Sequence, residues 1–293
     1  MSEENFMECN AYVTTLSTES YLDGVLALDK SLKNVGARYP LYVVLNEEIP
    51  NKVEIQLKEK GIETLRRKKI ELPEEIVNKN NSVGKDRWSY TFDKLNVFEL
   101  TQFKKIVFLD SDIYVRKNID DLFEKPHMSA VIDKRYGPHV TARFLKLTSG
   151  VIVIEPAKNQ LEKFKEIIET IIDKRYAIGD QDILQEYDPD WENKKELHLK
   201  NRYNTFFPYL EYYMNFQEYS IDDFCVIHFI YPKKPWMIKS ENRVENYIKY
   251  VNDFTEKDYK ETGIPEMKDA LYGKSENAKV IAKEYFNILD SIK

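Results

Sequence analysis

Three pairs of aspartates in this sequence have the spacing Asp-x-Asp, which lets two carboxylates share one metal ion. They are Asp110 with Asp112, Asp180 with Asp182, and Asp188 with Asp190. The first pair ends the mostly apolar run 105–110, which predicts a buried strand and therefore a fixed backbone at the edge of a sheet. Carboxylates held in that way suit a hard cation such as Mn²⁺ or Mg²⁺. The pair at Asp188 lies in a polar loop with a proline and is expected to be solvated.

The elements that must position these carboxylates alternate between strands and helices. Apolar and β-branched runs predict strands at residues 10–16, 41–45, 105–110, 128–132, 150–154 and 226–230. Apolar residues at helical spacing predict helices at residues 21–32, 53–60, 88–98 and 161–171. Residues 62–81 carry many charges and are expected to run over the surface. The alternation indicates an α/β fold, a mostly parallel central sheet with helices on both faces, whose ligands bind beyond the carboxyl ends of the strands.

The chain is expected to form one catalytic domain, because no glycine- and serine-rich linker and no internal repeat divides it. We expect this domain to occupy residues 1–250 and a C-terminal helical extension to occupy residues 251–293. The last helix carries an apolar stripe on one face, which includes Ile281 and Ile288. Its polar face is too weakly basic for lipid binding, so we expect the stripe to pack on the domain.

The composition is that of an ordinary soluble protein and argues against some partners. The 293 residues are 42% hydrophobic and 32% charged. A net charge of −6 argues against a nucleic-acid partner, which needs a basic face. No apolar run approaches the roughly 20 residues of a membrane span, and the first ten residues lack the basic start and the apolar stretch of a signal peptide. Cys9 and Cys225 are the only cysteines, so the expected location is the reducing cytoplasm.

The first Asp-x-Asp lies in a longer segment, residues 104–123 (KKIVFLDSDIYVRKNIDDLF), which resembles the metal-binding segment of glycosyltransferase family 8. In that family, which includes glycogenin and galactinol synthase, an Asp-x-Asp ends a strand and is followed by Asn-Ile-Asp-Asp-Leu-Phe. Four other stretches resemble motifs of the family in the same order: Thr14-Thr15-Leu16 with Tyr21, residues 92–95 (FDKL), residues 179–184 (GDQDIL) and residues 228–236 (HFIYPKKPW). Five motifs in order make the resemblance specific over residues 10–236.

The resemblance implies the GT-A fold, the nucleotide-sugar-binding type of α/β fold, and a set of site residues. Asp110, Asp112 and His228 are the implied ligands of a metal ion, with Mn²⁺ expected and Mg²⁺ as the alternative. The implied reaction transfers a hexose from UDP-glucose or UDP-galactose, with retention, to an acceptor that the sequence does not identify. Asp180 and Gln181 are the implied catalytic pair near the transferred sugar. The implied donor-binding residues are Thr14, Thr15, Leu16, Tyr21, Lys94, Asp110, Ser111, Asp112, Thr148, Ser149, Tyr231 and Lys234.

The chemistry of sugar transfer gives these residues physical roles. Breaking the bond between the anomeric carbon and UDP leaves growing negative charge on the diphosphate. A cation held by Asp110, Asp112 and His228 would neutralise that charge as a Lewis acid. The ammonium groups of Lys94 and Lys234 would add fixed positive charge. His228 would ligate as neutral imidazole.

Some of these assignments have plainer alternatives. A histidine after an apolar strand can be a hydrogen-bonded core residue, although the motif around His228 favours a ligand. Asp180 and Gln181 can belong to a helix cap, since aspartate is a preferred N-cap. Tyr203-Asn204 resembles a pair on the acceptor side of the family's site, or forms a turn. Asp180 is also the candidate nucleophile of a two-step retaining route, whereas a front-face route, in which the leaving phosphate assists the acceptor, needs none.

The chain departs from the family pattern at two places. Thr148-Ser149-Gly150 stands where the family usually has Asn-Ser-Gly, which leaves the identity of the donor sugar open. Tyr231 stands where the family has a glycine that lets the backbone approach the diphosphate. We expect Tyr231 to have a negative φ, because a positive φ costs about 1 kcal/mol or more for tyrosine. We also expect its hydroxyl to bond the diphosphate or the donor sugar.

Two other functions share the paired aspartates at a strand end. A nucleotidyltransferase or a UDP-sugar hydrolase should also show a glycine-rich, basic phosphate loop near the first strand, and residues 14–24 contain none. The other alternative is a protein that binds a UDP-sugar without turnover, and the complete triad of metal ligands argues against it.

Overall fold

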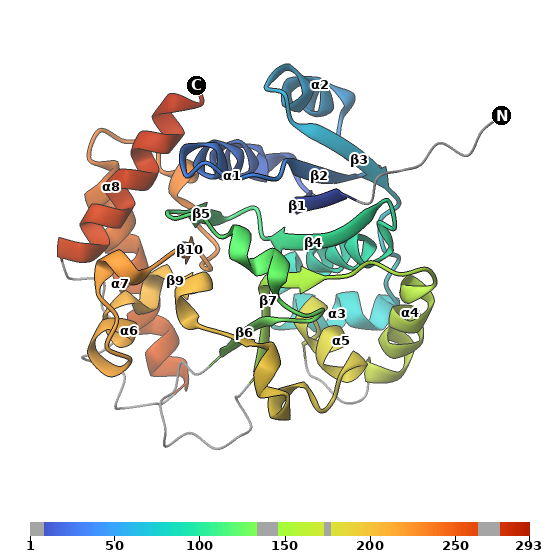
Figure 1. Ribbon diagram of the computed structural model, residues 1–293. Coiled ribbons are helices and arrows are strands. Elements are labelled where there is room, and N and C mark those ends of the chain that lie inside the picture. The colour runs from blue at the N-terminus through green and yellow to red at the C-terminus, as the bar shows by residue number, and fades with distance from the viewer. Residues whose placement is uncertain (1–8, 134–145, 173–176, 263–275) are drawn as a thin grey trace.

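The computed structural model of this chain describes residues 9–133, 146–172, 177–262 and 276–293 (Figure 1). Most of the first ten residues, which the signal-peptide prediction concerns, lie outside that range. The described strands form a larger sheet of order β3-β2-β1-β4-β7-β6-β8 and a smaller sheet of order β5-β10-β9. Their bounds are β1 Cys9–Leu16, β2 Leu41–Asn46, β3 Glu63–Arg67, β4 Phe103–Leu109, β5 Ile113–Val115, β6 Ala130–Asp133, β7 Lys146–Ile154, β8 His198–Leu199, β9 Thr205–Phe206 and β10 Val226–His228.

The larger sheet is mostly parallel, as predicted. β1 pairs in parallel with β2 and β4, β2 with β3, and β6 with β8. The exception is β7, which runs antiparallel to both β4 and β6. Because β1, β2 and β4 run in one direction, their carboxyl ends lie at the same edge of the sheet.

Helices cover both faces of the larger sheet (Figure 1). α1 and α2 pack on one face, while α3, the 3₁₀-helix η2, α4 and α5 pack on the other. The helix bounds are α1 Leu22–Asn34, α2 Asn51–Glu59, α3 Glu74–Ser82, η2 Asp86–Glu99, α4 Gln160–Ile171, α5 Asp180–Tyr187, α6 Leu210–Phe216, α7 Arg243–Thr262 and α8 Glu276–Ser291.

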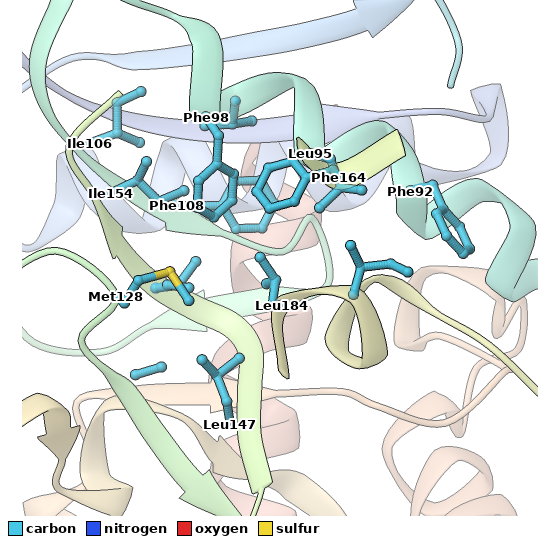
Figure 2. Packing of buried hydrophobic residues seen from close by; sticks show 14 of the residues in the cluster. Phe92, Leu95, Phe98, Ile106, Phe108, Met128, Leu147, Ile154, Phe164 and Leu184 are labelled. Carbon is cyan, nitrogen blue, oxygen red and sulfur yellow. The ribbon is translucent and has the colours of Figure 1, made fainter. Parts of the chain in front are cut away.

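The side chains of β4 alternate between two hydrophobic clusters. Ile106 and Phe108 belong to the cluster under η2 and α4, and Val107 and Leu109 belong to the cluster under α1. Figure 2 shows the first cluster, in which the helices present aromatic rings to the sheet. A strand that is buried on both faces needs a continuous apolar run, so the prediction of a buried strand before Asp110 is confirmed.

Residues 62–81 lie mostly at the surface, as predicted, but most of them form a strand, β3, and a helix, α3. β3 pairs with β2 as an edge strand, and α3 buries Ile76 and Asn80. Asn80 Nδ2 donates to the Ile178 carbonyl oxygen at 2.9 Å, and the Ile178 amide donates to Asn80 Oδ1 at 2.9 Å. These contacts span 98 residues of sequence, so no local pattern reports them.

α6, α7 and α8 gather at one end of the molecule around an aromatic cluster (Figure 1). Ile281 and Ile288 of α8 are buried there, as predicted for the apolar stripe. α7 runs through residue 250, so the predicted boundary falls inside one helix, and the division into residues 1–250 and 251–293 stays a prediction. Within the described residues, no helix combines the length and the apolar character that crossing a membrane requires.

Candidate active site

A cavity of about 580 Å³ opens where β1 and β4 end. Its wall also includes residues 148–150 of β7, the first turn of α5 and the loop after β10. The cavity therefore lies where an α/β sheet of this kind is expected to bind its ligand.

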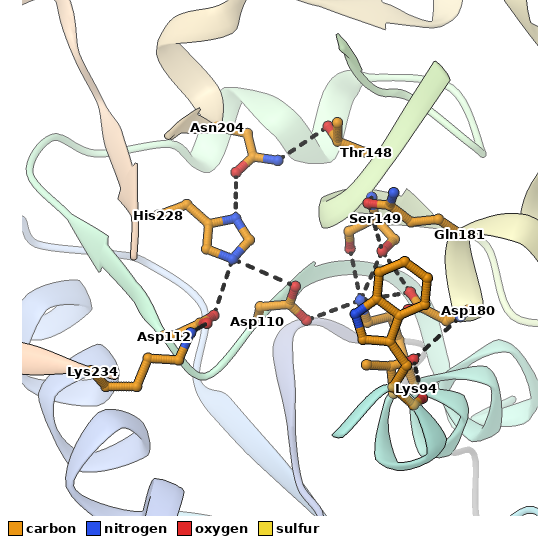
Figure 3. A network of polar contacts seen from close by, with 12 residues as sticks. Lys94, Asp110, Asp112, Thr148, Ser149, Asp180, Gln181, Asn204, His228 and Lys234 are labelled. Carbon is orange, nitrogen blue, oxygen red and sulfur yellow. Dashed lines mark hydrogen bonds and ion pairs between the residues drawn. The ribbon is translucent and has the colours of Figure 1, made fainter. Parts of the chain in front are cut away.

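Asp110, Asp112 and His228 meet at the wall of this cavity (Figure 3). Their candidate ligand atoms all lie within 4.8 Å of one another. The register of the smaller sheet brings them together, because β10 pairs with β5 so that His228 lies opposite Ile113, the neighbour of Asp112. Two carboxylates and one imidazole form an oxygen-rich donor set that fits Mn²⁺. The residues present therefore fit the implied ion.

The His228 ring is held so that Nε2 faces the two carboxylates. Nε2 lies 3.1 Å from Asp112 Oδ1 and 3.8 Å from Asp110 Oδ2. On the other side of the ring, Nδ1 lies 2.9 Å from Asn204 Oδ1. Gly150 lies against the ring, and a Cβ there would be 2.5 Å from His228 Cε1. His228 is buried, as a core residue would be, but its second nitrogen faces carboxylates at the cavity rather than apolar packing.

Asp112 is paired with a buried lysine. Lys234 Nζ donates to Asp112 Oδ2 at 2.6 Å and to the Phe229 carbonyl oxygen at 2.7 Å, and Lys234 is 2% exposed. Burial disfavours the Asp112 carboxylate, but the neighbouring ammonium of Lys234 outweighs burial and holds the pKa of Asp112 well below its usual range. Asp112 is therefore ionised at neutral pH and available to a cation.

A second charged cluster joins Asp110 to the start of α5 (Figure 3). Lys94 Nζ lies 3.0 Å from Asp110 Oδ1, 2.8 Å from Asp180 Oδ2 and 2.9 Å from Ser149 Oγ. Burial alone would lower the pKa of Lys94, but the carboxylates of Asp110 and Asp180 outweigh it and raise that pKa. Burial likewise opposes the charge of Asp180, and Lys94 nevertheless keeps the pKa of Asp180 low.

Asp182, rather than Asp180, caps α5. The Gly179 amide donates to Asp182 Oδ2 at 3.0 Å. The Asp180 carboxylate instead accepts from Ser149 Oγ at 2.5 Å and pairs with Lys94. Gln181 Oε1 accepts from the Ser149 amide at 3.1 Å. The helix-cap alternative is therefore wrong for Asp180, and both Asp180 and Gln181 line the cavity.

Residues 86–99 form a 3₁₀-helix, so the residues that share a face differ from those of an α-helix. A 3₁₀-helix has three residues per turn, so residues three apart share a face. Two adjacent faces border the cavity, one with Trp88, Thr91 and Lys94 and the other with Arg87 and Tyr90. The face in the core carries Phe92, Leu95 and Phe98. The helical spacing in the sequence grouped Trp88 with the core residues, and a period of three would have separated it from them.

Most of the predicted donor-binding residues line the cavity: Thr15, Tyr21, Lys94, Asp110, Ser111, Asp112, Thr148, Ser149 and Lys234. Thr14 and Leu16 do not, because side chains alternate along β1 and both are fully buried in the interior. The side chains of Thr14 and Leu16 therefore do not line the cavity, and the assignment of this segment to the donor site stays a prediction.

Tyr231 points away from the cavity, so its predicted contact with the donor is wrong. Its hydroxyl lies 2.9 Å from Thr255 Oγ1, and its ring centroid lies 4.5 Å from that of Phe254. The ring is buried in the aromatic cluster beside α7. The cluster offers apolar surface to the ring, and Thr255 of α7 offers a hydrogen-bond partner to its hydroxyl. The predicted backbone is confirmed, since the described residues with positive φ, other than glycines, are Met128, Asn159 and Glu218.

A sequence profile described as glycosyl transferase family 8 matches residues 12–239. Similar curated proteins include inositol phosphorylceramide glucuronosyltransferase 1 of Arabidopsis thaliana, 30% identical over 185 residues that cover 63% of this chain and 31% of that protein. Glycogenin-1 of Caenorhabditis elegans is 27% identical over 234 residues that cover 77% of this chain and 50% of that protein. The chain therefore spans half or less of the length of these two relatives.

The fold is similar to that of a solved galactosyltransferase. The structure of LgtC in complex with donor and acceptor sugar analogs matches with a TM-score of 0.58 at 15% identity, over 96% of this chain and 95% of that chain. At this identity the likeness concerns the fold alone, and it confirms the predicted GT-A fold.

Proposed function

This chain belongs to glycosyltransferase family 8, and we propose that it transfers a hexose from a UDP-sugar to an acceptor with the help of a divalent cation. The observation that carries the proposal is the meeting of Asp110, Asp112 and His228 at one cavity, with candidate ligand atoms within 4.8 Å of one another. Lys94 and Lys234 lie beside these residues and supply positive charge at the same wall. This arrangement favours an enzyme that turns over the UDP-sugar, rather than a protein that only binds it.

The residues of the cavity have separate tasks in this proposal. The cation, when bound, supplies Lewis-acid stabilisation of the charge that develops on the UDP leaving group. Lys234 adds a fixed positive charge that needs no reorganisation during the reaction. Asp180 and Gln181 contact the transferred sugar or the acceptor. Lys94 keeps Asp180 ionised, which makes it a stronger acceptor of hydrogen bonds and is required of a nucleophile.

We propose UDP-glucose or UDP-galactose as the donor, Mn²⁺ as the cation and retention of configuration. The two relatives described above are named a glucuronosyltransferase and a glycogenin, so membership of the family leaves the sugar open. The hydroxyl of Thr148 donates to the Val131 carbonyl oxygen, and the hydroxyl of Ser149 donates to Asp180. Both groups are thus engaged within the protein, and the donor has to be identified by experiment.

A panel of UDP-sugars incubated with the protein and Mn²⁺ tests this function. We expect UDP release from UDP-glucose or UDP-galactose to exceed release from UDP-glucuronate by about tenfold or more, a difference of about 1.4 kcal/mol in transition-state binding. EDTA should abolish release, and NMR should show an α-linkage in the first product. Release that EDTA does not affect would contradict the proposal. If free hexose forms as fast as UDP is released with every saccharide offered as acceptor, the protein is a hydrolase instead.

A further inference from the structure

A chain of hydrogen bonds connects His228 Nδ1, on the side of the ring away from the carboxylates, to a backbone carbonyl group of the larger sheet. Thr148 Oγ1 lies 2.7 Å from the carbonyl oxygen of Val131, its partner across the β6–β7 pair. A carbonyl oxygen only accepts, so the single hydroxyl hydrogen of Thr148 is directed to it. The same Oγ1 lies 3.1 Å from Asn204 Nδ2 and must accept a hydrogen bond from that amide. Thr148 therefore fixes which end of the Asn204 side chain faces the sheet.

The other end of the Asn204 amide faces His228. Asn204 Oδ1 lies 2.9 Å from His228 Nδ1, and an amide oxygen only accepts, so Nδ1 carries the hydrogen. In the neutral ring, the form that ligates a metal, Nε2 then carries the lone pair and faces Asp112 Oδ1 at 3.1 Å and Asp110 Oδ2 at 3.8 Å. A lone pair and two carboxylates repel one another unless a positive charge lies between them.

The chain of contacts is shielded from water. Asn204 is 1% exposed and Thr148 is 2% exposed, so the solvent offers them few other partners. The His228 ring is also fixed in its plane, because Gly150 lies against it and the Phe206 ring stands edge to face at a centroid distance of 5.5 Å. Because the ring and the amide are both fixed, the hydrogen bonds can run in one direction only. His228 Nδ1 donates to Asn204, Asn204 donates to Thr148, and Thr148 donates to the Val131 carbonyl oxygen.

We propose that Thr148 and Asn204 are positioning residues of the cation site. They hold His228 in the tautomer with hydrogen on Nδ1, and so direct the lone pair of Nε2 toward the cation. The inference rests on the proposed function, because it concerns the same site. It gives Thr148 and Asn204 a task at the cation site in addition to their predicted places, which are the donor side for Thr148 and the acceptor side for Asn204.

Mn²⁺ affinity, measured by calorimetry in the presence of UDP, tests the proposal. Leucine is similar in size to asparagine but lacks the amide, so Asn204→Leu should weaken Mn²⁺ binding by about 10- to 100-fold. Losses of this size are typical when the hydrogen-bond partner of a metal-binding histidine is removed. Asn204→Asp keeps an oxygen that accepts from Nδ1 and should recover most of the affinity. Thr148→Val should weaken binding less than Asn204→Leu, since the amide can then turn either way. Thr148→Ser keeps the hydroxyl and should bind Mn²⁺ as the wild type does.

Unchanged Mn²⁺ affinity in both Asn204→Leu and Thr148→Val would overturn this inference while leaving the proposed function intact. Wild-type protein that binds UDP but no Mn²⁺ would overturn both. If the variants do not fold, ¹⁵N NMR of the histidine rings in the wild-type protein with Mg²⁺ and UDP decides. The chain has four histidines, and the signals of His228 are those lost in His228→Ala. Hydrogen on Nδ1 is the expected result, and hydrogen on Nε2 would overturn the inference.

Discussion

Asp110→Asn is expected to lower the rate of UDP-sugar turnover by about 100-fold or more without loss of thermal stability. Asparagine keeps the shape of the side chain but withdraws a charge from the cation, and a Lewis-acid contribution of several kcal/mol corresponds to at least two powers of ten. Burial raises the pKa of Asp110, so its charge disfavours the metal-free folded state. Lys94 still has Asp180 as a partner in the variant. The measurements are the initial rate with Mn²⁺ and the thermal unfolding of metal-free protein.

Asp190→Asn is the matched control, because Asp190 also belongs to an Asp-x-Asp pair but is exposed and bonded to Asn193. It should keep the wild-type rate. An Asp110→Asn variant as active as this control would contradict the role of Asp110 at the cation site. A slow Asp110→Asn variant with a much lower unfolding temperature would attribute the loss of rate to folding instead.

Lys94→Met is expected to lower the free energy of unfolding by about 3–5 kcal/mol, the usual effect of removing one partner of a buried ion pair. Lys94 is 3% exposed and pairs with both Asp110 and Asp180. In the wild type, the lowered pKa of Asp180 contributes stability above the unfolded pKa, and this contribution is lost as the pH falls. Without Lys94, burial raises the pKa of Asp180, so acidification toward about pH 5 should stabilise the variant relative to the wild type. Urea unfolding of metal-free protein at both pH values measures this.

Lys69→Met makes the same substitution at the surface. Lys69 Nζ lies 3.0 Å from Glu48 Oε1, and the two side chains are 33% and 56% exposed. An exposed pair of this kind contributes about 1 kcal/mol or less, so the control should lose little stability. An equally small loss in Lys94→Met would contradict the account of the buried cluster. Addition of Asp180→Asn to Lys94→Met should restore part of the lost stability.

The strands that carry the cation site could be predicted because their signals are local. One apolar run ends at Asp110, and the apolar run predicted as a strand at residues 226–230 contains His228, so both candidate ligands could be assigned to strands. The contact between His228 and Asn204 could not be predicted, because it depends on the pairing of β10 with β9 and β5. Hydrogen bonds between residues distant in sequence leave no periodic pattern. Tyr203-Asn204 was therefore noticed only as a family motif.

Two side chains could not be placed from the sequence, because one pattern fits more than one environment. The predicted helix at residues 88–98 is present, but it is a 3₁₀-helix, which brings Trp88 to the cavity. Tyr231 was expected to bond the diphosphate or the donor sugar, because Lys233 and Lys234 beside it favour an anion. The aromatic cluster beside α7 instead buries the ring, and Thr255 takes the hydrogen bond. Tertiary packing decides the place of Tyr231, which cannot be read from neighbouring residues, whereas the place of Trp88 depends on the period of its helix.

Calorimetric titration of UDP into wild-type protein, once with Mn²⁺ and once with EDTA, tests most directly whether this cavity is a cation-dependent nucleotide site. The two carboxylates and His228 would hold the cation and the diphosphate as one unit, so binding should be measurable with Mn²⁺ and weaker by about tenfold or more with EDTA. Equal affinity under the two conditions, or no binding of UDP with Mn²⁺, would contradict the account.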